Sequence, residues 1–140
     1  MKRSVRLLAT VALLAMTVAA GSSSLWLVDR GDLAHQVTAM RAAHGLPPLQ
    51  EAPDLTAYAN DHSWKMATHG SIWHSNLANV PGTWTSVGED VARASEVWLS
   101  VRAMMDSPAH RQVMLGNWRE IGYGNIRKDG QVYVTLVFRR

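Results

Sequence analysis

The 140-residue chain contains no cysteine and a single phenylalanine, and several motifs of catalytic chains are missing as well. Without cysteine there can be no disulfide, no thiolate ligand and no thiol nucleophile, so an apolar core must hold the domain together. The sequence also lacks a G-x-S-x-G motif, a phosphate-binding glycine loop and an H-E-x-x-H helix. Histidines and carboxylates therefore remain as the candidate chemical groups, and any metal site must be assembled from distant segments.

An excess of basic charge is also missing from most of the chain. The formal net charge is +3, from 14 basic and 11 acidic side chains. Lys2, Arg3 and Arg6 carry this excess, because no acidic residue lies among the first twenty. The remaining residues are formally neutral. This balance gives no support to a nucleic-acid partner.

The first twenty residues have the three-part layout of a secretory signal peptide. A basic start, residues 1–6, is followed by an apolar run over residues 7–20 that ends in small side chains. That run is shorter than the roughly 20 residues that a permanent membrane-spanning helix needs. We expect a signal peptide at 1–20, a linker at 21–31 and one domain at 32–140. The protein is then secreted or held in the cell envelope, with no membrane span after cleavage.

Apolar periodicity and turn residues predict several helices followed by a hairpin. Helices are expected over residues 32–45, 54–70, 95–106 and 107–116, beginning at Asp32, Asp54, Ser95 and Ser107. Two alternating segments, 120–126 and 131–138, flank an Asp-Gly pair, which is typical of a β-hairpin with a primed turn. Helices set around a small antiparallel sheet indicate an α+β fold.

Five blocks in chain order resemble the CAP superfamily, also called SCP-like extracellular domains, in its bacterial secreted branch. They are Met-Arg-Ala-Ala-His-Gly-Leu-Pro-Pro-Leu at 40–49, Trp-His-Ser at 73–75, Val-Gly-Glu-Asp-Val-Ala at 87–92, Met-Asp-Ser-Pro-Ala-His-Arg at 105–111 and Ile-Gly-Tyr-Gly at 121–124. The resemblance runs from about residue 33 to residue 138. It implies an α-β-α sandwich with a central antiparallel sheet, in which Glu89 ends a strand near residues 86–91.

The resemblance also implies a cleft lined by His74, Glu89 and His110. Two imidazoles and a carboxylate suit a divalent ion such as zinc or magnesium, as in metal-assisted hydrolysis. The same trio could act without metal, with Glu89 orienting a histidine as general base. It could also satisfy buried polar groups and fix the packing of loops.

Several positions depart from the family pattern, and two of them bear on the cleft. Asp90 replaces the usual asparagine beside the glutamate. Animal and fungal members have a second cleft glutamate, for which Glu96 is the candidate at an expected helix start. His62 is expected in the core or at its rim, whereas His35, His44 and His69 are expected to be solvated.

The function favoured at this point is a secreted, non-enzymatic binding module. Its cleft would take a lipid or another ligand of the cell envelope, with Trp73 and Trp84 as possible contacts. The alternative is a divalent-metal-dependent hydrolase of peptide, ester or cell-wall substrates that uses His74, Glu89 and His110. The six tryptophans are otherwise expected to pack the core.

Overall fold

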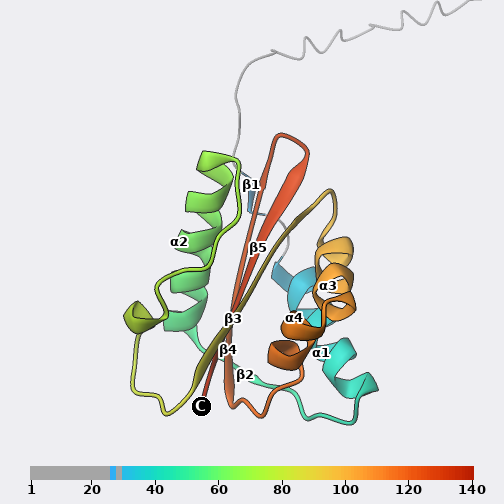
Figure 1. Ribbon diagram of the computed structural model, residues 1–140, viewed down its shortest axis with the longest axis vertical. Helices are drawn as coiled ribbons and strands as arrows, with labels where there is room; N and C mark the ends of the chain where they lie inside the picture. The colour runs from blue at the N-terminus through green and yellow to red at the C-terminus, as the bar shows by residue number, and fades with distance from the viewer. Residues whose placement is uncertain (1–25, 28–29) are drawn as a thin grey trace, which may run out of the picture.

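The computed structural model describes residues 26–27 and 30–140, so the predicted signal peptide lies outside the described residues. A sheet stands between two layers of helices, and Figure 1 views it nearly edge-on. Helix α2 (Pro53–His69) covers one face, and α1 (Arg30–Ala43), α3 (Val97–Asp106) and α4 (Pro108–Met114) cover the other. The predicted α+β class and the sandwich are confirmed.

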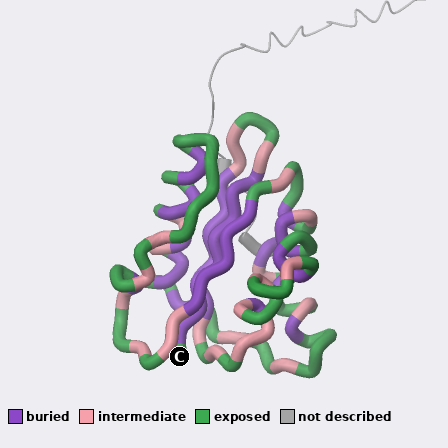
Figure 2. The backbone as a smooth tube through the Cα atoms, in the orientation of Figure 1, coloured by how far each residue is buried: buried purple, intermediate pink, exposed green. Residues whose placement is uncertain are grey.

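The sheet has the strand order β1-β4-β5-β3. Its long strands are β3 (Val87–Ala94), β4 (Glu120–Lys128) and β5 (Gln131–Arg139), and its short ones are β1 (Trp26–Leu27) and β2 (Gln50–Glu51). All neighbours are antiparallel except β2, which pairs in parallel with β4 and makes the sheet mixed. The three long strands are buried almost throughout, as Figure 2 shows in purple.

The hairpin between β4 and β5 has the predicted two-residue turn. Asp129 and Gly130 have φ angles of 49° and 73°, which a primed turn requires. The turn sets the register that pairs Lys128 with Gln131 and, at the far end, Glu120 with Arg139.

Two glycines allow α2 to pack closely on β4. A Cβ at Gly122 would overlap the backbone of Leu55, and one at Gly124 would overlap the carbonyl of Ala59. On this face of the sheet Met66 and Ala67 of α2 pack against Val91, Ile126 and Tyr133. The opposite face holds the larger cluster, which includes Leu33, Met104, Met114, Leu136 and Phe138.

Several helix starts differ from the expectation by one or two residues. Helix α1 begins at Arg30, which places Asp32 in its first turn instead of at the cap. Helix α2 begins at Pro53, because proline is well suited to the first helical position. Helix α3 begins at Val97 instead of Ser95. Part of the predicted linker at 21–31 is in regular structure, namely β1 and the first residues of α1, while the domain boundaries themselves stay a prediction.

Among residues 26–27 and 30–140, no helix is both long and apolar enough to cross a membrane.

Candidate functional site

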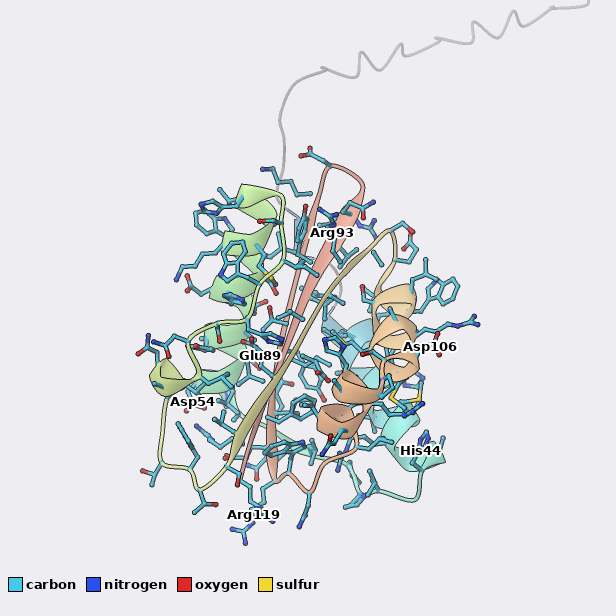
Figure 3. The ribbon with its side chains drawn as sticks, viewed as in Figure 1. His44, Asp54, Glu89, Arg93, Asp106 and Arg119 are labelled. Carbon is cyan, nitrogen blue, oxygen red and sulfur yellow. The ribbon has the colours of Figure 1, made fainter. Side chains whose placement is uncertain are left out.

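Glu89 lies on β3, on the face covered by α2, and its side chain is completely buried. The strand is longer than expected, so Glu89 is its third residue and not its end. Its carboxylate accepts three hydrogen bonds: from His74 Nδ1 at 2.9 Å, from Ser75 N at 2.8 Å and from Ser75 Oγ at 2.5 Å. Both oxygens are therefore engaged, and they hold the segment after α2 against the sheet (Figure 3).

The segment around Ser75 is also tied to α2. Tyr58 donates its hydroxyl proton to Ser75 Oγ or to the carbonyl of Asn76, each 2.9 Å away. Sequence reasoning missed Ser75 and Tyr58 as members of the site. The adjacent His-Ser pair was the available signal for Ser75, whereas nothing in the sequence indicates that Tyr58 reaches it.

His74 and His110 lie close to each other. Their ring centroids lie 6.4 Å apart and the ring planes differ by 26°. Each Nδ1 has a protein partner, because His74 Nδ1 bonds to Glu89 and His110 Nδ1 lies 2.9 Å from Ser107 Oγ. An ionised carboxylate only accepts hydrogen bonds, so Nδ1 of His74 carries a proton and its Nε2 has a lone pair when the ring is neutral. The His74 side chain is 58% exposed.

Ser107 stands at the predicted start of α4, but its hydroxyl does not cap the helix. The residue has the N-cap position and Pro108 follows it, while its side chain makes no capping hydrogen bond. The hydroxyl instead contacts His110 one turn later. The serine thus fixes the orientation of the imidazole.

The three predicted ligands do not form a ready metal site. In the described part of the chain, no group of three or more histidine or carboxylate side chains is arranged to hold a metal ion. Glu89 is buried and already accepts three hydrogen bonds, so the Nε2 atoms of the two histidines are the ligands left for a metal ion. Catalytic zinc takes three protein ligands, and magnesium prefers oxygen. These residues, as arranged, fit a resident zinc or magnesium ion poorly.

Two pockets of contrasting character lie on either side of residues 72–75. The apolar pocket, of about 220 Å³, lies over β3 and is lined by Ile72, Val91, Ala92, Arg93, Ala103, Met104, Ser107 and His110. The polar pocket, of about 260 Å³, lies against α2 and is lined by Tyr58, Asp61, His62, Lys65, Trp73, His74, Ser75, Asn76 and Asn79. The histidine pair thus bridges two different surfaces.

The other predicted residues are placed apart from one another. Trp73 shares the polar pocket with His74. Trp84 lines a separate pocket of about 440 Å³ with Arg119 and Arg140, and neither histidine of the pair reaches it. Glu96 is the N-cap residue of α3 and pairs with Arg127 at 3.1 Å. It does not line the apolar pocket or the polar pocket.

The remaining histidines fall as expected. His62 is 5% exposed, and its Nε2 lies 2.7 Å from the carbonyl oxygen of Trp73. His35, His44 and His69 are exposed.

Asp90, the neighbour of Glu89 in the sequence, has a strongly raised carboxyl pKa. It is fully buried on the face opposite to Glu89, where it pairs with Leu136 of β5. Neither carboxylate oxygen has a hydrogen-bond partner in the described structure. Burial, with a smaller contribution from the charge of Glu89, raises the pKa of Asp90 from 3.8 to about 7.

Solved structures with the same fold come from several bacteria. An outer surface protein from Borrelia burgdorferi aligns with a TM-score of 0.71 at 18% identity, over 80% of this chain and 92% of its own. An extracellular protein with an SCP domain from Bacillus anthracis aligns with a TM-score of 0.67 at 20% identity, over 79% of this chain and 39% of its own. A cysteine-rich secretory protein from Staphylococcus aureus gives 0.64 at 23% identity, over 77% and 36%.

These likenesses concern the fold, since each identity is below 25%. No curated protein sequence matches the chain. The sequence model of the cysteine-rich secretory protein family, CAP, matches residues 35–138. That span covers both histidines, Glu89, all four helices in large part and the closing hairpin. Although it has no cysteine, the chain belongs to the CAP family, the cysteine-rich secretory protein family.

Proposed function

We propose that the chain is a secreted, non-enzymatic binding domain for a lipid or another cell-envelope ligand with an apolar part. The observation that carries this proposal is the position of the apolar pocket beside the histidine pair. His110 lines that pocket together with aliphatic and methionine side chains, among them Val91 and Met104. Ile72 also lines the pocket and is 47% exposed, so it adds apolar surface at the pocket mouth.

The polar groups of the cleft support binding more than reaction. Glu89 already accepts three hydrogen bonds and has no exposed side-chain surface, so it positions His74 instead of meeting a ligand. The Nε2 atoms of His74 and His110 remain to hydrogen-bond a polar head group. A ligand with an apolar tail and a polar head would satisfy both surfaces.

Secretion is part of this proposal. It rests on the signal-peptide layout of the first twenty residues. The proteins that share the fold include one described as an outer surface protein and one described as extracellular, which agrees with a place outside the cytoplasm.

A fluorescent fatty acid provides a direct test. The purified full chain should increase the probe's fluorescence in a saturable way. Ala103 is an exposed residue on the wall of the apolar pocket, so Ala103→Trp should fill the pocket and weaken binding at least about tenfold. Ala57→Trp, at an exposed position of α2 outside this pocket, is the matched control and should bind as the parent does.

Two results would contradict the proposal. One is no saturable binding of the fatty acid, together with no lipid in an organic extract of the protein purified from its own envelope. The other is turnover of ester, peptide or cell-wall substrates that needs added zinc or magnesium and disappears in His74→Ala, which would establish the hydrolase instead.

A further inference from the structure

The polar pocket has a composition unlike that of the apolar pocket. It lies between α2 and the chain that returns alongside this helix towards residues 77–79 (Figure 1). Its volume is about 260 Å³, and every lining side chain is polar or aromatic, with none aliphatic. A hydrocarbon chain would therefore leave many polar groups without partners there.

Trp73 gives this pocket a rigid aromatic surface. The indole is 39% exposed. Its ring centroid lies 5.6 Å from that of His62 and 5.6 Å from that of His69, with ring planes 86° and 89° apart. Its carbonyl oxygen also lies 2.7 Å from His62 Nε2. The ring is thus held in place before any ligand arrives, which lowers the entropic cost of binding.

The charges of the pocket cancel. Asp61 and Lys65 form an ion pair at 2.6 Å, with both side chains more than half exposed. The pocket contains no other aspartate, glutamate, lysine or arginine. A strongly anionic or cationic ligand would therefore find no net complementary charge, whereas a neutral polar ligand could bond to both members of the pair.

Two amides add donors and acceptors. Asn79 is exposed and lines the pocket. Asn76 uses its oxygen to accept from Ala78 N at 3.1 Å, which leaves its NH₂ group available. Amides of this kind match hydroxyl groups, because each hydroxyl both donates and accepts.

We infer that the polar pocket binds a neutral saccharide, with a C–H face of one sugar ring against Trp73 and its hydroxyls on Asp61, Lys65 and the two amides. At about 30 Å³ for each water, the cavity holds the volume of roughly nine waters, which is room for one sugar ring. The indole supplies a large contact area and the polar groups fix the orientation. This inference goes beyond the proposed function, because it concerns the opposite side of residues 72–75 and needs no ligand in the apolar pocket.

The test is an NMR titration of the isotope-labelled full chain with a tetramer of N-acetylglucosamine. The indole N–H signals of the tryptophans report binding, and the tryptophan variants assign them. We expect the Trp73 signal to shift saturably. Trp73→Ala should weaken binding about tenfold or more, whereas Trp98→Ala, which removes a tryptophan of α3 that is also exposed (48%), should leave binding unchanged.

A second variant covers the case in which Trp73→Ala alters the fold. Asn79→Leu changes an exposed side chain and should also weaken binding, with the remaining spectrum intact. Ala103→Trp, designed to fill the apolar pocket, should leave sugar binding unchanged, so failure here and failure of the proposed function are distinguishable.

Three results would overturn the inference. The first is no saturable shift with up to about 10 mM of the N-acetylglucosamine tetramer, and none with a glucose tetramer at the same concentration. The second is binding that persists unchanged in both Trp73→Ala and Asn79→Leu. The third is binding that Trp98→Ala weakens as much as Trp73→Ala does.

Discussion

The buried carboxylate of Asp90 yields the sharpest prediction, namely that Asp90→Asn stabilises the protein at neutral and alkaline pH. The side chain is fully buried on the face that carries the larger core cluster, and its oxygens have no partner in the described structure. An amide has almost the same shape and no charge. The CAP resemblance also puts an asparagine at this position, so the backbone should accept the change.

The magnitude follows from the pKa. Burial raises the pKa of Asp90 from 3.8 to about 7. Below about pH 4 the acid is protonated in the folded and the unfolded states, and its ionisation costs the fold nothing. Between pH 4 and 7 the unfolded chain releases the proton and the folded chain retains it, so stability falls as pH rises. Three pKa units correspond to about 4 kcal/mol in the free energy of unfolding, and this whole amount is lost above pH 7.

Asp90→Asn should remove this dependence. We expect the variant and the parent to unfold with free energies within about 1 kcal/mol of each other at pH 4. At pH 8 the variant should be more stable by about 4 kcal/mol. Urea denaturation at half-unit steps between pH 4 and pH 8 measures the free energy of unfolding of both proteins. Subtracting the parent from the variant cancels the titration of all other groups, because both proteins contain them.

Asp129→Asn is the matched control, because it makes the same chemical change at an exposed turn residue whose positive φ suits asparagine. Its stability should run parallel to that of the parent across the whole range. The reasoning on Asp90 fails if Asp90→Asn also runs parallel to the parent, or if NMR titration of the folded parent gives Asp90 a pKa near 4.

Three further changes test the packing and the polar contacts. Gly124→Ala should destabilise the fold by about 2–4 kcal/mol in urea denaturation, because the new methyl overlaps the carbonyl of Ala59 under α2. Arg139→Met should cost about 2–3 kcal/mol, because it removes a guanidinium that is 9% exposed and leaves two carboxylates without their partner. Arg102→Met, in an exposed pair, should stay within about 0.5 kcal/mol. Glu89→Gln should cost about 1–3 kcal/mol, because an amide NH₂ would face donors that now bond to a carboxylate; an unchanged unfolding midpoint would count against this account of the site.

The hairpin and the helices were predictable because their signals are local. An Asp-Gly pair between alternating segments determines a turn within four residues, and proline or glycine marks the ends of α2 and α4. The pairing of β2 with β4 was not predictable, since it joins two-residue and nine-residue segments far apart in the sequence. The exact length of β3 was missed for a related reason, because its end depends on pairing with β5.

The site residues were predictable only through the family blocks. Residue spacing alone gives no reason to bring His74 next to His110, since the two lie on a loop and on α4. The resemblance supplied that contact, but it did not indicate that Ser75 would donate to both oxygens of Glu89 or that Trp84 would line another pocket. Such details depend on side-chain orientation, which a sequence pattern does not determine.

Glu89 and Asp90 show how strand alternation assigns opposite roles to adjacent identical groups. Successive side chains of β3 point to opposite faces, so Glu89 meets the loop after α2 and Asp90 meets the apolar core. The loop supplies three donors to the first carboxylate, whereas the core supplies none in the described structure to the second. One acid therefore anchors the loop of the proposed binding site, and the other is expected to lower the free energy of unfolding at neutral pH. A variant at position 90 should accordingly change the free energy of unfolding and leave fatty-acid and saccharide binding unchanged at concentrations where the protein is folded.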